Sequence, residues 1–105
     1  MLPPSAFDRE GFLCRLDDWS PAVAEQIAAG EQIVVTEAHW EVIHLLRQYY
    51  SEFDSSPAMR ALVKYCGFKL GVDKGRSIYL LSLFPGSPAR LGSKIAGLPK
   101  PANCL

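Results

Sequence analysis

The sequence predicts a small, mostly α-helical domain of about five helices, with a little extended chain first and an extended arm last. Apolar residues recur at helical spacing over most of the chain. Ser-Pro and Thr-Glu pairs stand where helices would begin, and Pro and Gly interrupt the final stretch. A length of 105 residues, 49% of them hydrophobic, suits one domain over residues 1–105 with a single core.

The N-terminal part contains the only segment with a strand-like pattern. Residues 1–10 include Pro3 and Pro4, which discourage a helix. The following "GFLCRL" alternates apolar and polar residues, so Phe12, Cys14 and Leu16 would share one face. This pattern predicts a short, half-buried strand.

Two helices follow. Ser20 is a candidate N-cap for the first, which would begin at Pro21 and stop at Gly30. Thr36 is able to cap the second, over residues 36–53, which has the strongest helical pattern in the chain. Its expected core-facing stripe is Val42, Leu45, Leu46, Tyr49 and Phe53.

Three more helices are expected after a polar interruption at residues 54–57. Ser56 and Pro57 would restart the chain as a helix over 58–71, and further helices are predicted over 77–85 and 87–97. The expected buried face of the helix over 58–71 is Met59, Leu62, Val63, Cys66 and Leu70.

The helical signals stop near Ile95. Gly97, Pro99 and Pro101 prevent regular structure beyond it, so residues 94–105 are expected to form an extended arm.

Composition excludes several classes of protein. Eleven basic and eleven acidic residues give no net charge, which makes direct DNA binding through counterion release unfavourable. No apolar run reaches the roughly 18–20 residues that a membrane span needs, and the N-terminus lacks a secretory signal pattern. We therefore expect a cytoplasmic protein without membrane contact. Three cysteines, an odd number without paired spacing, predict reduced thiols.

The three thiols differ in their surroundings. Cys14 and Cys66 lie on apolar faces, where thiols pack as small hydrophobes. Cys104 lies one residue before the end of the sequence, with no amphipathic pattern that would bury it. The neighbouring terminal carboxylate disfavours its thiolate and Lys100 offsets part of that effect. The residues alone leave open a reactive thiol and a tail cysteine without function.

No metal or cofactor is expected. His39 and His44 are five residues apart on one predicted helix, which separates them around its axis and suits packing or surface roles better than a shared ion. A glycine-rich phosphate loop and a nucleophile–base arrangement with recognisable spacing are also missing from the sequence.

Four stretches, "HWEVIHLLRQYY", "SPAMRALVKY", "LFPGSPAR" and "KIAGLPKPANCL", occur in order along the chain. Together they resemble the DsrC/TusE family of sulfur-relay proteins, from about Gly11 to Leu105. The final G-L-P-K-P-x-x-C-x pattern, from Gly97 to Leu105, is the most specific of them.

The resemblance implies a mostly helical fold with a short N-terminal β-hairpin and a C-terminal arm whose Cys104 carries sulfur as a persulfide. In the TusE branch the sulfur comes from a TusBCD-type complex and goes to an enzyme that thiolates the tRNA wobble uridine. In the DsrC branch a second arm cysteine takes part. That position is Ser93 here, which favours the single-thiol, TusE-like branch. The sequence "MLPPSAF" matches the first hairpin strand poorly, so the hairpin is expected to be truncated or absent.

The first hypothesis is therefore a sulfurtransferase component, a carrier rather than a stand-alone enzyme. Arg60, Lys64, Lys94 and Lys100 are the candidates for stabilising the persulfide or contacting a partner, and ordinary solvated charge is the alternative for each. The second hypothesis is a single-cysteine, DsrC-like protein of a sulfur-oxidation pathway with a regulatory or DNA-binding role. Its basis is the pair of helices predicted on either side of residues 54–57, which resembles a helix-turn-helix.

Overall fold

The computed structural model describes residues 1–102 and contains five α-helices there, preceded by two single-turn 3-10 helices. The expected mostly helical fold is thus confirmed. The elements are η1 (Pro4–Ala6), η2 (Leu16–Asp18), α1 (Pro21–Gly30), α2 (Glu37–Phe53), α3 (Met59–Leu70), α4 (Ser77–Leu83) and α5 (Pro88–Ile95).

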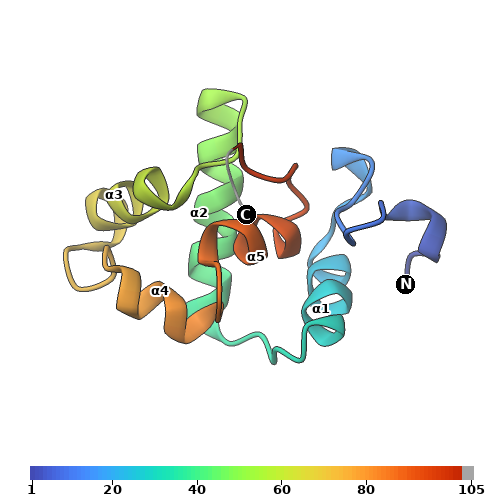
Figure 1. Cartoon of the computed structure of the whole chain (residues 1–105), viewed down its shortest axis with the longest axis horizontal. Helices are drawn as coiled ribbons and strands as arrows, with labels where there is room; N and C mark the ends of the chain where they lie inside the picture. The colour runs from blue at the N-terminus through green and yellow to red at the C-terminus, as the bar shows by residue number, and fades with distance from the viewer. Residues whose placement is uncertain (103–105) are drawn as a thin grey trace.

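Helix α5 lies at the centre of the molecule, and the other four helices surround it (Figure 1). Ser87 caps it by accepting a hydrogen bond from the Arg90 backbone N–H, and Pro88 occupies its first turn. Every residue from 91 to 98 is buried. The core around α5 includes Leu46, Leu62, Leu80, Phe84, Ile95 and Leu98.

Helices α1 and α2 begin where the sequence predicts. The Ser20 hydroxyl accepts a hydrogen bond from the Val23 N–H. Thr36 precedes α2 and forms a capping box with His39, whose Nδ1 accepts from the Thr36 N–H at 3.1 Å. Within residues 1–102 no helix is long and apolar enough to cross a lipid bilayer.

The N-terminal hairpin is reduced to one antiparallel bridge between Phe7 and Leu13. The predicted alternation is wrong: Phe12 and Leu13 are both buried, whereas Cys14 is exposed. Without a paired strand no ladder imposes a two-residue period, so two consecutive side chains are both buried. The expectation that Cys14 fills the core is therefore wrong.

Two other details differ from the expected ones. Helix α3 begins at Met59, close to the expected start, but its N-cap residue is Ala58, and Ser56 donates its hydroxyl hydrogen to the Pro99 carbonyl oxygen. Lys94 and Ile95 are the last residues of α5 and are buried, so extended chain begins later than residue 94. The terminal turn of α5 is retained because its residues fill the core.

Candidate functional site: the base of the C-terminal arm

The chain leaves α5 through a tightly held segment, residues 95–99, here called the arm base. The Trp19 indole N–H donates to the Ile95 carbonyl oxygen at 3.0 Å. The Arg47 guanidinium donates to the next carbonyl oxygen, that of Ala96, at 2.6 Å. The last carbonyls of a helix have no intrahelical partner, so these two side chains satisfy groups that would otherwise be unpaired.

Trp19 and Arg47 also contact each other. The guanidinium carbon lies 4.0 Å from the centroid of the Trp19 ring, a cation–π geometry. Burial lowers the pKa of Arg47 from its ordinary value, although an arginine keeps its charge at any physiological pH. Segments from before α1 and from the middle of α2 therefore meet over the end of α5.

Gly97 makes the sharp turn that follows. Its φ of +74° lies in the left-handed region, and a β-carbon there would lie 2.3 Å from Trp19 Cδ1. One residue beyond Leu98, the Ser56 hydroxyl donates to the Pro99 carbonyl oxygen at 2.6 Å. The direction in which the arm starts is thus fixed by Trp19, which precedes α2 in the chain, and by Ser56, which follows α2.

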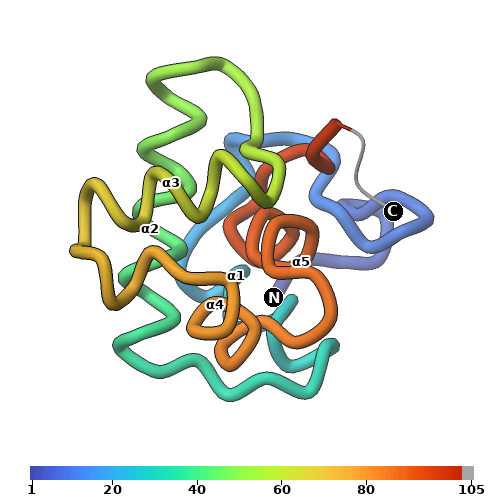
Figure 2. The backbone as a smooth tube through the Cα atoms, turned by 60° about the vertical axis from the view of Figure 1, so that its left-hand side comes forward, coloured from blue at the N-terminus to red at the C-terminus, as the bar shows by residue number. Residues whose placement is uncertain are grey.

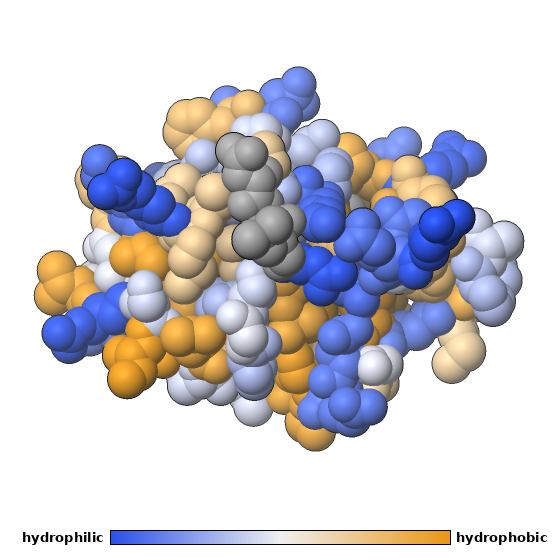
Figure 3. Space-filling model, viewed as in Figure 1, coloured by the Kyte–Doolittle hydropathy of each residue, from blue (hydrophilic) through white to orange (hydrophobic). Residues whose placement is uncertain are grey.

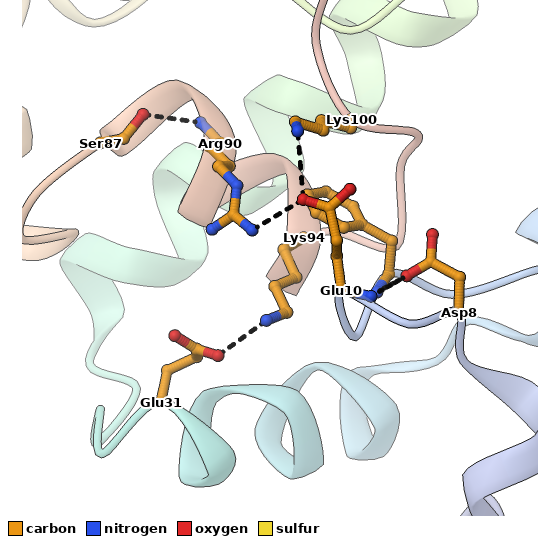
Figure 4. Close-up of polar contacts among 8 residues, drawn as sticks. Asp8, Glu10, Glu31, Ser87, Arg90, Lys94 and Lys100 are labelled. Atoms are coloured by element: carbon orange, nitrogen blue, oxygen red, sulfur yellow. Dashed lines mark hydrogen bonds and ion pairs between the residues drawn. The ribbon is translucent and has the colours of Figure 1, made fainter. Parts of the chain in front are cut away.

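The N-terminal segment touches the arm through one carboxylate. Glu10 accepts hydrogen bonds from Lys100 and Arg90, each at 3.1 Å (Figure 4). These hydrogen bonds, the one from Lys100 first, lower the pKa of Glu10. Figure 2 shows the N-terminal loop beside the end of the described chain. Lys100 is therefore the predicted cation that lies on the arm, and it is paired with Glu10.

Lys94 lies in a different place from the one expected. It is buried in α5, and its ammonium forms an ion pair with Glu31 at 2.8 Å (Figure 4). Its side chain fills the space over Gly11, where a β-carbon would lie 2.7 Å from Lys94 Cε. Its ammonium therefore ties α5 to the end of α1.

Arg60 and Lys64 lie exposed on α3. In the described part of the chain they form no ion pair, whereas Lys94 pairs with Glu31 and Lys100 with Glu10. The four predicted cations are therefore not brought together into one cluster.

The cysteines have contrasting environments. Cys66 is buried as predicted, and burial raises the pKa of its thiol to about 11. Cys14 is exposed. Cys104 lies outside the described residues. Because a thiolate is the reactive form, Cys66 is the less reactive of the two described thiols.

The two histidines have structural partners. His39 Nε2 donates to the Leu83 carbonyl oxygen at 2.9 Å, because Nδ1 is the acceptor for the Thr36 N–H. His44 is exposed and stacks on Trp40. Among residues 1–102 no three His, Cys, Asp or Glu side chains are grouped as metal ligands.

Sequence reasoning missed Trp19, Arg47 and Glu10, which hold the arm and its base. Each is distant in sequence from its partner; Arg47 and Ala96, for example, are separated by 49 positions. Arg47 lies one helical turn from both Ile43 and Tyr50, and this was the one available signal, since a charge beside apolar residues on a helix face needs a polar partner.

A family model for DsrC like protein matches residues 4–105. The chain belongs to the DsrC-like family. This DsrC-like chain is 51% identical to the sulfurtransferase TusE of Sodalis glossinidius over 98 residues, 93% of this chain and 91% of that protein. The identity to the sulfurtransferase TusE homolog of Haemophilus influenzae is also 51%, over 93% of this chain and 90% of the other.

Solved DsrC structures have the same fold. The NMR structure of Allochromatium vinosum DsrC matches with a TM-score of 0.86 and 48% identity, covering 94% of this DsrC-like chain and 88% of the other. The oxidized gamma-subunit of the dissimilatory sulfite reductase from Archaeoglobus fulgidus matches with a TM-score of 0.80 and 38% identity, covering 94% and 90%.

Proposed function

We propose that this protein is a cytoplasmic sulfur carrier that accepts sulfane sulfur as a persulfide on Cys104 and passes it to a partner protein. The observation that carries the proposal is the roughly half identity to TusE sulfurtransferases over nearly the whole chain. The arm motif that contains Cys104 lies within the segment that the family model matches.

The chemistry requires one thiol. The Cys104 thiolate attacks the outer sulfur of a donor persulfide, so a new S–S bond forms on Cys104 and the donor cysteine leaves as a thiolate. An acceptor thiolate then attacks the outer sulfur of the Cys104 persulfide, and Cys104 leaves as a thiolate. The sulfane sulfur moves unchanged in oxidation state, so no external oxidant or reductant is consumed.

The arm base suits such a carrier. Contacts from Trp19, Arg47 and Ser56 hold residues 95–99, while Pro99 and Lys100 are exposed. A fixed base limits the directions that the following residues explore, and proline reduces the entropy lost when a chain docks.

The TusE-like branch is the form of the relay that we propose. The donor is a TusBCD-type complex, and the acceptor is the enzyme that thiolates the tRNA wobble uridine. Ser93, buried in α5, supports a carrier with one arm thiol, since a serine hydroxyl cannot form a disulfide.

The test is reconstituted transfer of labelled sulfur from a TusBCD-type donor through this protein to tRNA. The wild type and Cys14→Ser should both support thiolation, and Cys104→Ser should not. Cys14→Ser is the matched control because Cys14 is the described thiol that solvent reaches. Thiolation that continues at the wild-type rate with Cys104→Ser would refute the proposal.

A further inference from the structure

The apolar stripe of α2 continues past the core onto the surface. Val42, Leu45 and Leu46 are buried as predicted, but Phe53 is 55% exposed at the end of the helix. Phe68 on α3 is 82% exposed. Figure 3 shows apolar side chains at the surface over the α3–α4 end of the molecule. Clustered exposed aromatic residues are typical of interaction sites.

These side chains line a hollow of about 400 Å³ between the end of α2 and α3, here called the aromatic groove. Its lining residues are Tyr49, Phe53, Ala61, Lys64, Tyr65 and Phe68.

The aromatic groove has an ordered floor. Tyr49 contacts Phe53 with ring centroids 4.5 Å apart and Tyr65 edge-on with centroids 5.1 Å apart. The Tyr65 hydroxyl donates to Glu52 at 2.9 Å. Desolvation and this hydrogen bond raise the pKa of Tyr65 to about 12, so the hydroxyl keeps its proton at physiological pH. A floor already held in place costs little to order on binding.

One end of the aromatic groove is positively charged. A second hollow of about 580 Å³ adjoins it, sharing Ala61 and Lys64 and reaching Arg60 and Ala58. Ala58 precedes α3 without a side-chain cap, and the first intrahelical N–H donor is that of Leu62. The helix therefore presents unpaired N–H groups there, beside two exposed cations.

We propose that the aromatic groove docks an acidic amphipathic helix of a protein partner in the relay. An apolar side chain of that helix inserts between Phe53 and Phe68, and its carboxylates meet Arg60, Lys64 and the start of α3. Ala61 and Phe68 are seven positions apart, or about 10 Å along the helix. Two turns of a partner helix span the same length.

The groove adjoins the arm base through residues 54–58, which link α2 to α3. Ala58 lines the second hollow, which adjoins the charged end of the groove, and Ser56 donates a hydrogen bond to the Pro99 carbonyl oxygen. The link between α2 and α3 passes beside the arm base (Figure 1), so a partner seated in the groove lies near the point from which the arm starts. This inference rests on the proposed function only for the identity of the partners.

A single-stranded RNA segment fits the surface less well. Stacking of successive bases needs several open ring faces. The groove offers the ring of Phe68, which is 82% exposed, but the rings of Tyr49, Phe53 and Tyr65 contact one another. RNA binding also depends on a basic excess, whereas the protein has zero net charge and the Glu52 carboxylate is bonded to Tyr65 of the groove. The charge and packing favour a protein helix.

The test is isothermal titration of the full-length protein with a TusBCD-type complex, with the tRNA-thiolating enzyme and with tRNA alone. Phe68→Ser and Lys64→Glu are compared with Val72→Ser, a control that is 81% exposed and does not line the groove. We expect both groove variants to bind at least one protein partner ten or more times more weakly, and Val72→Ser to bind like the wild type.

Three outcomes would overturn the inference. In the first, the groove variants bind both protein partners like the wild type. In the second, the variants lose only their binding to tRNA. In the third, they change only the self-association of this chain in sedimentation experiments. Loading of Cys104 by a small-molecule persulfide should stay unchanged in Phe68→Ser. If Cys104 of the wild type is not loaded by the persulfide at all, the carrier function is refuted instead. Failure of the docking proposal is therefore distinguishable from failure of the proposed function.

Discussion

The Arg47 guanidinium stacks on the Trp19 ring at 4.0 Å, and both side chains donate to consecutive carbonyls at the end of α5. Because the two donors come from different segments, the arm base is held from two directions. Arg47 and Trp19 therefore link the helical domain to the segment from which the arm starts.

Replacing Arg47 should loosen this junction. Arg47→Met keeps much of the side-chain volume but leaves the Ala96 carbonyl oxygen without its donor, and a lost charge-assisted hydrogen bond costs about 1.5–3 kcal/mol. Urea denaturation should show that loss of stability. Arg15→Met is the control, since Arg15 is exposed. Equal stabilities of the two variants would contradict the assigned role.

Gly97 should tolerate no side chain. The left-handed φ of +74° and the 2.3 Å approach of a β-carbon to Trp19 predict that Gly97→Ala loses about 2–4 kcal/mol. Gly30→Ala is the matched control, because a β-carbon there meets no atom within 4 Å. Thermal denaturation gives both values. A Gly97→Ala protein as stable as the control would mean that the turn is not required.

Ser93 should be replaceable with a gain in stability. Its hydroxyl is fully buried and is the one buried side-chain polar atom without a hydrogen-bond partner among residues 1–102. Removing an unpaired buried polar group is favourable, so Ser93→Ala should raise the free energy of unfolding by up to about 1 kcal/mol. Ser51→Ala, at an exposed position of α2, controls for helix propensity. A destabilised Ser93→Ala protein would show that the hydroxyl has a favourable role.

Acid should release the contact between the N-terminal segment and the arm. Hydrogen bonds from Lys100 and Arg90 hold the pKa of Glu10 below its ordinary 4.5. A carboxyl with a lowered folded-state pKa stabilises the fold above its unfolded-state pKa, and this contribution is lost as the pH falls through the lowered value. NMR resonances of the Lys100 side chain should therefore shift below pH 4.5 in the wild type and not in Glu10→Gln. A Glu10 titration at or above 4.5 would argue against the contact.

The helices were predictable because their signals are local. Ser20 and Thr36 precede α1 and α2 as their residue types predict, and Ser87 caps α5. Ser56 has the same residue type and also precedes a proline, but its hydroxyl bonds Pro99, 43 positions away. A sequence pattern does not reveal that a distant acceptor competes with a local cap.

The arm base was harder to predict, because its contacts join segments far apart in sequence. Lys94 looked like an exposed cation on an arm, but the helix continues through it and Glu31 neutralises it. Cys14 was expected on the buried face of a strand, but a strand needs a paired neighbour. Within residues 1–102 the chain forms only one bridge, so the alternation of buried and exposed residues is not maintained. The arm motif itself needed no tertiary information, since it is a contiguous run of residues.

The most direct test of the carrier function is peptide-resolved mass spectrometry after the protein has been incubated with a persulfide donor. Cys66, buried and with its pKa raised to about 11, serves as the internal negative control, and Cys14→Ser removes the exposed competitor. We predict one added sulfur atom on the peptide that contains Cys104, in the wild type and in Cys14→Ser. Sulfur found only on the Cys14 peptide, or on no peptide, would contradict the account.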